Sequence, residues 1–334
     1  MKLIAETAWH HEGDFSFMKN LIHEITTKTD VDLVKMHITL DFDSYMDSKH
    51  ELYSDLKSML FSKNQWKELI KIVQDSNKGL MLLTNDAAAV EFVAPFEPEI
   101  VELHSTCLNV PHLQTSILNN LQEDVKVVIG VGGCTLEEIE NAVQTFQKRQ
   151  TILMFGFQNY PTKYEDVNIS KIKKIQSLYP KKFFGYADHT AWNEPNNELI
   201  TLLVATHSMD FIEKHVTNAF GQKRIDSSAA ISIDMCNNLS KRIKLLKKLN
   251  GNGSTDLNEG EQSYSTYGPM KLAALAKSDL KSGHIISFDD IYFKRTNEKT
   301  DLSQLDIIKL IGKSINISIY KNEILKSSHF KKIL

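Results

Sequence analysis

The sequence of 334 residues has only three cysteines, no long run of apolar residues and almost no excess of either charge. Cys107, Cys134 and Cys236 are far apart and odd in number, so they fit neither a disulfide framework nor a zinc pattern, and we expect buried thiols. No stretch reaches the roughly 20 apolar residues that span a bilayer. The first residues are apolar, but Glu6 interrupts them at a point where the apolar segment of a signal peptide would continue. We therefore expect a cytoplasmic protein without a membrane partner.

The chain also lacks an electrostatic footprint for nucleic acid. Its 39 basic and 42 acidic residues are well mixed and leave a formal charge of -3. Apolar residues make up 42% and charged residues 24%, which is typical of a globular protein. A chain of this length exceeds what one core usually organises, so we expect one large domain and one small domain.

Short apolar runs recur along the first two thirds of the chain, and segments with helical spacing lie between them. Met18, Leu21, Ile22 and Ile25 have the spacing of a helix that is buried on one side. Residues 135–138 form a capping box, and we expect Leu136, Ile139, Val143 and Phe146 to share the buried face of the following helix. The eight apolar runs, which we interpret as strands, are residues 3–5, 33–36, 80–83, 100–103, 125–129, 151–155, 183–186 and 209–212.

This alternation indicates parallel strands joined by helical crossovers. Eight such units over about 220 residues favour a closed (β/α)8 TIM barrel, whose usual size is about 250 residues. A doubly wound open sheet is the alternative, although the sequence has no glycine-rich dinucleotide or P-loop signature to favour it.

The pattern changes after residue 250. Residues 250–262 are rich in Gly, Asn, Ser and acids, as exposed linkers are. Residues 275–291 contain short apolar pieces broken by turns, too short for another barrel unit. We predict a barrel domain over residues 1–250, a linker over 251–267 and a small domain over 268–334.

Active sites of parallel barrels lie at the C-terminal ends of the strands, so polar residues at the ends of the apolar runs are candidates. Glu6 and Lys35 belong to the first two strands, Tyr160 follows the sixth, and Asp188-His189 and Glu213-Lys214-His215 close the last two. His189 and His215 end neighbouring strands and could converge on one divalent ion. From the residues alone, a single histidine in a barrel is more often a hydrogen-bonded structural residue, while Glu6 and Lys35 could equally be a solvated pair and Tyr160 a packed aromatic.

Four ordered segments resemble the sialic acid synthase family. They are residues 4–14 (IAETAWHHEGD), 159–168 (NYPTKYEDVN), 185–190 (GYADHT) and 213–217 (EKHVT). Residues 279–283, 290–295 and 311–313 resemble that family's small antifreeze-like (SAF) domain.

This resemblance implies a (β/α)8 barrel that condenses phosphoenolpyruvate with an N-acyl amino sugar to give a nonulosonic, sialic-acid-like sugar acid and phosphate. It implies a divalent metal, Mn2+ or Mg2+, on His189 and His215, with Glu6 and Asp226 as carboxylates around the sugar and the ion. It also implies that Lys35 binds phosphoenolpyruvate. The implied substrate contacts are Tyr160, Gln158, Ser105, Asp188 and Arg295. Arg295 would reach the site of the other subunit in a domain-swapped homodimer.

The chain departs from the family pattern on the phosphate side of the site. Glu102 stands where the family has a lysine, Gly130 and Ala187 stand where it has serines, and Gln158 replaces an asparagine. The usual Ser-Thr-Pro-Phe after the third strand reads Met81 to Thr84. Glu102 could pair with a cation such as Lys126, or it could repel phosphate.

Three functions follow from this pattern. The first is the synthase reaction on phosphoenolpyruvate, and the second is a metal-dependent aldolase or lyase that uses another keto-acid donor. The third is a non-catalytic barrel that binds a sugar or a partner synthase. Release of phosphate in the presence and absence of manganese would separate the first from the others.

Overall fold

The structure is a computed structural model that describes residues 1–156 and 159–331. The chain forms two compact units, Met1–Gly251 and Asn252–Leu334. Gln158, a predicted substrate contact, lies outside the described residues.

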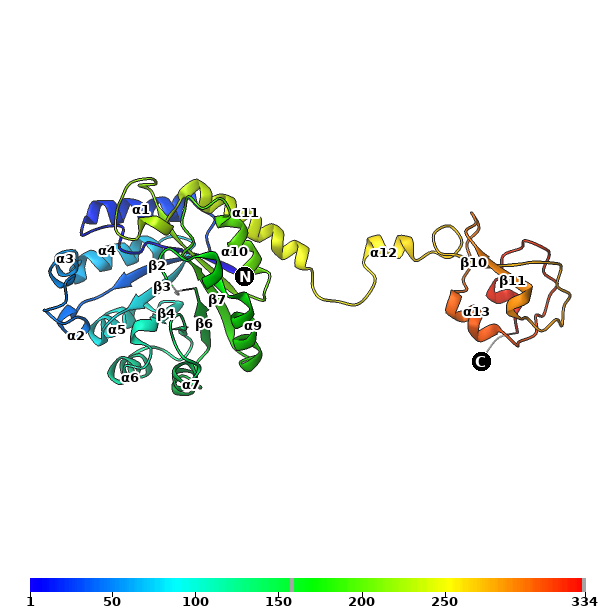
Figure 1. Ribbon diagram of the computed structural model, residues 1–334, viewed down its shortest axis with the longest axis horizontal. Helices are drawn as coiled ribbons and strands as arrows, with labels where there is room; N and C mark the ends of the chain where they lie inside the picture. The colour runs from blue at the N-terminus through cyan, green and yellow to red at the C-terminus, as the bar shows by residue number, and fades with distance from the viewer. Residues whose placement is uncertain (157–158, 332–334) are drawn as a thin grey trace. The chain divides into compact units, whose positions relative to one another are not determined.

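The first unit is built on a closed parallel barrel (Figure 1). Each of the first eight strands pairs with the next one in parallel, and β1 pairs with β8 to close the ring. A short ninth strand, β9 (Ile231–Ser232), extends from β8. The predicted (β/α)8 barrel is thus confirmed, and the open-sheet alternative is wrong. The strands are β1 (Lys2–Glu6), β2 (Leu33–Ile38), β3 (Gly79–Thr84), β4 (Ile100–Leu103), β5 (Lys126–Gly130), β6 (Thr151–Phe155), β7 (Phe183–Asp188) and β8 (Phe211–Thr217).

Helices connect the strands and surround the barrel (Figure 1). Asp14 caps α1 through its side chain, and Met18, Leu21 and Ile22 are buried as predicted. The capping box at Thr135 is also present, but Leu136 is 48% exposed because it occupies the first turn of its helix. The helices of this unit are α1 (Phe15–Lys28), α2 (Phe42–Tyr45), α3 (Tyr53–Ser58), α4 (Lys63–Gln74), α5 (Ala87–Val93), α6 (Pro111–Asn120), α7 (Leu136–Thr145), α8 (Tyr164–Val167), α9 (Ile169–Leu178), α10 (Asn197–Ala205) and α11 (Ile233–Asn250).

The apolar core of the barrel has two layers. The larger layer packs the helices against the outside of the sheet, with Ile22, Leu69 and Val127 among its members. The smaller layer fills the barrel interior below the site, and it consists of Ile4, Leu33, Met81, Ile100, Val128, Ile152, Met154, Ala187 and Phe211. Cys107 and Cys236 are buried free thiols, whereas Cys134 is only half-buried.

The predicted eighth strand ends too early. Residues 213–215 were expected to close it, but β8 runs on to Thr217 and all seven of its residues are buried. The charged residues stay within the strand because both of its faces offer partners. Glu213 faces Lys35 and Lys214 pairs with Asp188.

The second unit has its own small core. β10 (Ala273–Ala276) pairs antiparallel with β11 (Ile291–Lys294), and α13 (Gln304–Leu310) packs with them. Buried apolar residues such as Ala276, Ile307 and Ile319 hold this unit together. A short helix, α12 (Glu259–Tyr264), forms within the segment predicted to be a linker. None of the helices in the described part of the chain is long and apolar enough to cross a membrane.

Candidate active site

A cavity of about 350 Å³ lies where the barrel strands end. The chain reversals that follow β1, β6 and β8 add Trp9, Tyr160 and Asp226 to the strand ends. The cavity wall is polar on the side of β1, β2 and β8 and largely apolar near β3, β5 and β6. The lining residues are Glu6, Trp9, Lys35, His37, Tyr45, Leu83, Asn85, Glu102, His104, Ser105, Gly130, Met154, Phe155, Tyr160, Ala187, His189, Glu213, His215 and Asp226.

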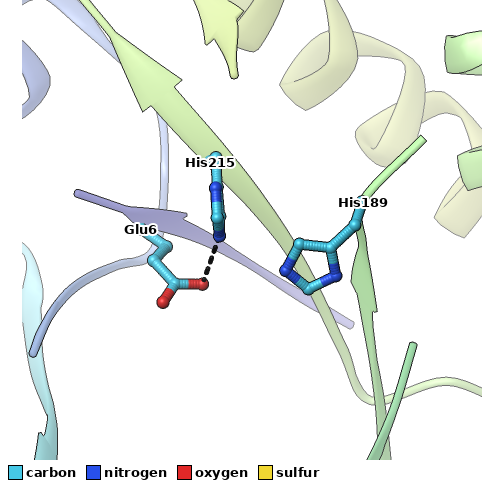
Figure 2. A group of neighbouring side chains, drawn as sticks. All are labelled: Glu6, His189 and His215. Carbon is cyan, nitrogen blue, oxygen red and sulfur yellow. Dashed lines mark ion pairs between the residues drawn. The ribbon is translucent and has the colours of Figure 1, made fainter. Parts of the chain in front are cut away.

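Glu6, His189 and His215 form one buried cluster in this cavity (Figure 2). Potential ligand atoms of the three side chains all lie within 4.8 Å of one another. Parallel pairing places Glu6 directly opposite His215, and His189 immediately follows β7. The Oε2 atom of Glu6 lies 3.3 Å from Nε2 of His215. One carboxylate and two imidazoles are a donor set that Mn2+, Zn2+ or Fe2+ accepts.

The protonation state of His189 suits a cation. Burial and, to a lesser extent, the neighbouring His215 lower the pKa of His189 to about 4, so His189 is neutral near pH 7. Its Nδ1 lies 3.1 Å from the carbonyl oxygen of Gly156. Because a carbonyl only accepts, Nδ1 carries the hydrogen and Nε2 carries the lone pair that a metal requires.

Glu6 supplies the negative charge of the cluster. Burial acts to raise its pKa, but Lys35, His215 and His37 together bring the pKa well below its ordinary value. The same pairing works in reverse on His215: burial acts to lower its pKa, and Glu6 outweighs burial and raises it. The Nδ1 atom of His215 is buried and has no hydrogen-bond partner among the described residues. A buried imidazole atom without a partner is expected where a ligand completes the site.

A second buried cluster surrounds Lys35. Its Nζ lies 2.6 Å from Oε2 of Glu102 and 2.9 Å from Oε1 of Glu213. It also lies 3.3 Å from Oε1 of Glu6, which joins the two clusters. Burial acts to lower the pKa of Lys35, but Glu102 and Glu213 raise it, so its ammonium form is retained. Burial, together with the neighbouring Glu6, raises the pKa of Glu213 well above its ordinary value.

The predicted pairing of Glu102 with Lys126 is wrong. Glu102 contacts Lys35 instead, whereas Lys126 lies 3.6 Å from Glu99. Side chains of a strand alternate between its two faces, so Glu102 enters the barrel, while Lys126 is the first residue of β5 and lies at its opposite end.

Tyr160 and Asp226 meet above the two histidines. The hydroxyl of Tyr160 donates to the backbone oxygen of Asp226, and the Tyr160 ring lies 5.7 Å from His189 and 5.9 Å from His215 between centroids. Burial raises the pKa of Tyr160 to about 12. The Asp226 backbone lies in the left-handed region with φ 59°, and its carboxylate accepts from the backbone nitrogen of Trp9 at 3.2 Å. Both residues line the cavity, where the resemblance implies that they act.

Asp188, a predicted substrate contact, points away from the cavity. Its neighbour Ala187 lines the cavity, so alternation directs Asp188 to the outer face of β7. There it pairs with Lys214 at 3.1 Å and accepts from the hydroxyls of Thr190 and Thr201. These partners use its oxygens, so we interpret Asp188 as a support for β7 and β8.

The remaining predicted contacts lie in different units. Ser105 lines the cavity at the start of the turn after β4. Arg295 belongs to the second unit, where its guanidinium donates to the backbone oxygen of Pro269 at 2.9 and 2.6 Å. Its predicted role at a partner's site stays a prediction.

Sequence reasoning missed His37, which lines the cavity, and His10, which packs against His215, and it assigned Glu213 no role. His37 contacts Glu6 through Nε2, and strand alternation from Lys35 could have identified it. The ring of His10 lies edge-on to His215, 5.7 Å between centroids, and His10 Nε2 contacts the backbone oxygen of Asp226 at 3.0 Å. His10 follows β1 in an irregular segment, so local periodicity carried no signal for it.

Comparison with known proteins points to one group of enzymes. The sequence matches the NeuB family over residues 26–255. It is 26% identical to an uncharacterized protein of Methanocaldococcus jannaschii over 92% of this chain and 88% of that protein. It is 22% identical to the N,N'-diacetyllegionaminic acid synthase of Legionella pneumophila, over 98% of this chain and 94% of the synthase. Among solved structures, the N-acetylneuraminic acid synthetase of Leptospira borgpetersenii superposes with a TM-score of 0.70 at 23% identity, covering 78% of this chain and 88% of the other.

Proposed function

The protein belongs to the NeuB family, a family of carbon–carbon bond-forming synthases, and on that premise we propose that it is a metal-dependent synthase of a nonulosonic acid. The family indicates condensation of phosphoenolpyruvate with a sugar. We propose that the acceptor is the aldehyde carbon of an N-acyl amino sugar and that the donor is a three-carbon 2-oxo acid or its enol form.

The observation that carries this proposal is the buried cluster of Glu6, His189 and His215. A divalent ion at such a cluster supplies positive charge that polarises a carbonyl oxygen toward attack by an enol carbon. The donors fit an ion because Glu6 is ionised and His189 is neutral with its lone pair on Nε2.

The chain's own residues would position the reactants around that cluster. Tyr160 and Asp226 line the side of the cavity nearest the histidines and can hold sugar hydroxyls. Glu6 contacts both His37 and His215, so one carboxylate orients two imidazoles. The apolar wall of Leu83, Met154 and Phe155 excludes water from the donor side, which strengthens every polar interaction within the cavity.

The first test measures metal binding, before any reaction is assayed. Calorimetry with Mn2+ should show one site in the wild-type protein, and His189→Ala and His215→Ala should each weaken binding at least about 100-fold because each removes a ligand. His23→Ala, at an exposed position on α1, is the matched control and should bind as the wild type does. Equal Mn2+ affinity in both cavity variants would contradict the site.

Product formation then separates an enzyme from a binding barrel. The metal-loaded protein with N-acetylmannosamine as a probe acceptor and pyruvate or phosphoenolpyruvate as donor should yield a nine-carbon acid by mass spectrometry. A protein that binds Mn2+ but forms no product from either donor with any N-acyl amino sugar would be a non-catalytic barrel.

Three further features are part of this proposal. We propose that residues 268–334 form an antifreeze-like domain, that the chain assembles as a domain-swapped homodimer, and that it works in the cytoplasm. The resemblance of residues 279–283 and 290–295 to that domain supports the first two.

A further inference from the structure

We propose that the donor of this site is a non-phosphorylated 2-oxo acid of the pyruvate class, and that Glu102 excludes enol phosphates by occupying Lys35. This inference rests on the proposed function, since it assumes that the cavity joins a donor to an aldehyde. It concerns the donor alone and leaves the metal cluster unchanged.

The carboxyl groups that crowd around Lys35 are the first reason. Its Nζ donates a hydrogen bond to Oε1 of Glu213 at 2.9 Å. Three carboxyl oxygens, one each from Glu102, Glu213 and Glu6, lie within 3.3 Å of Lys35 Nζ. The whole side chain is buried. A phosphate oxygen would therefore have to displace one of these carboxyl groups before it could reach the ammonium.

The charge around Lys35 is the second reason. Within the described part of the cavity wall, Lys35 is the sole lysine or arginine. The same wall carries the carboxyl groups of four acidic residues, Glu6, Glu102, Glu213 and Asp226. Phosphoenolpyruvate carries two negative groups, a phosphate and a carboxylate. Burying a negative charge beside carboxylates costs free energy unless that charge has its own positive partner. Pyruvate carries a single negative charge, which a divalent ion at the Glu6 cluster would offset.

The shape of the wall is the third reason. Gly130 ends β5 against the turn that starts at Ser105. A Cβ atom at Gly130 would lie 2.7 Å from the backbone nitrogen of Ser105, so no side chain fits there without moving that turn. Ala187, Met154 and Phe155 continue the same wall without a polar side-chain atom. These four residues, Gly130, Met154, Phe155 and Ala187, accommodate a methyl or methylene carbon and offer no side-chain donor to a phosphate.

The reaction balances without phosphate. The methyl C–H bond of the 2-oxo acid breaks, and its electron pair forms the new bond to the aldehyde carbon. The proton ends on the aldehyde oxygen, which becomes a hydroxyl group. No oxidant, reductant or leaving group is needed, and the product is a 4-hydroxy-2-oxo acid, the open-chain form of a nonulosonic acid.

The first experiment follows the methyl protons of pyruvate. The Mn2+-loaded wild-type protein in deuterium oxide should exchange these protons, measured as a mass increase of pyruvate, at a rate at least tenfold above that of the His215→Ala variant. With phosphoenolpyruvate and N-acetylmannosamine, the same protein should release no phosphate above the protein-free rate. Phosphate release from phosphoenolpyruvate would overturn the inference, and so would a metal-loaded protein that neither binds nor exchanges pyruvate.

The second experiment changes Glu102. Glu102→Gln removes one negative charge beside Lys35 and nearly preserves its shape. We expect phosphoenolpyruvate to bind about tenfold more tightly by calorimetry, with pyruvate affinity changed less than about threefold. Glu99→Gln, which removes a carboxylate just before β4 and outside the cavity, is the control and should change neither affinity.

The two proposals fail differently. Absence of Mn2+ binding would refute the metal site and hence the proposed function. Normal Mn2+ binding together with phosphate release, or with unchanged phosphoenolpyruvate affinity in a folded Glu102→Gln variant, would refute only the choice of donor.

Discussion

Asp188 and Lys214 show at the residue scale how a charged pair beside a reactive site can be structural. Both side chains are fully buried, and they are opposite each other in the β7–β8 register. Lys214 also donates to the side-chain oxygen of Asn197 at 3.0 Å, which ties β8 to the start of α10. The pair therefore fixes the strand that carries His215 and the strand that leads into His189.

We predict that Asp188→Asn destabilises the fold by about 3–5 kcal/mol, because it leaves the buried Lys214 ammonium without its anion. Thermal or urea unfolding measures this loss. The double variant Asp188→Asn with Lys214→Met should recover most of it, since an uncharged pair of similar size has no charge to desolvate. A stable Asp188→Asn protein with weakened donor or sugar binding would instead restore the predicted substrate role.

The same pair predicts a pH dependence. Burial acts to raise the pKa of Asp188, but Lys214 and the hydroxyls of Thr190 and Thr201 bring it below its ordinary value of 3.8. A lowered folded-state pKa means that the stabilisation is complete above pH 3.8 and is lost as the pH falls through the lowered pKa. The stability difference between wild type and Asp188→Asn should therefore shrink below about pH 4. A difference that stays constant to the lowest pH at which the proteins fold would contradict this assignment.

At the scale of elements, the ends of β6 and β7 approach each other closely around Gly156. Its φ is +108°, and a Cβ atom there would lie 2.0 Å from the backbone oxygen of Ala187. The carbonyl oxygen of Gly156 is also the group that orients the imidazole of His189. The packing of these two strand ends therefore determines which nitrogen of His189 faces the cluster.

We predict that Gly156→Ala weakens Mn2+ binding by about 10- to 100-fold, because it displaces the carbonyl that orients His189. It should also destabilise the fold by about 1–3 kcal/mol through backbone strain and overpacking. Gly133→Ala is the control, because Gly133 also has positive φ but has no heavy atom within 4 Å of an added Cβ. It should show only the strain and leave Mn2+ affinity unchanged. Calorimetry and thermal unfolding of both variants test this, and equal Mn2+ affinity in the two would argue against the role of Gly156.

At the level of the whole molecule, we predict that each active site is shared between two subunits, with Arg295 supplied by the partner. Arg295 is exposed and held by its own unit through Pro269. A dozen flexible residues have a root-mean-square reach of roughly 20 Å, which permits a small domain to cross to a partner. An arginine is suited to such a role because its planar fork binds a carboxylate or an acyl oxygen through two hydrogen bonds.

Mixing two inactive variants tests this arrangement. His215→Ala and Arg295→Ala proteins, each inactive alone, should regain activity after subunit exchange, because some mixed dimers contain one intact site. Full activity of the Arg295→Ala protein alone would show that Arg295 is not needed at the active site. Sedimentation as a monomer, or no recovery after verified exchange, would count against a site shared between subunits.

The barrel and the elements of its outer layer could be predicted from the sequence alone. Apolar runs of strand length alternating with stripes such as Met18, Leu21 and Ile22 are local patterns, and they persist because each element buries one face. Ordered motifs around Glu6, Tyr160, His189 and His215 indicated the family and identified several residues that line one cavity. These features could be read because each depends on spacing along the chain.

The contacts between charged groups, in contrast, depend on the three-dimensional fold. Glu6, Lys35, Glu102 and Glu213 come from four different strands, and the closure of the barrel brings them into one cluster. The sequence suggested Lys126 as the partner of Glu102 and a substrate as the partner of Asp188, because chain proximity and motif membership do not specify the face of a strand. Side-chain direction follows from strand register, and register is set by the pairing of segments that lie far apart in the sequence.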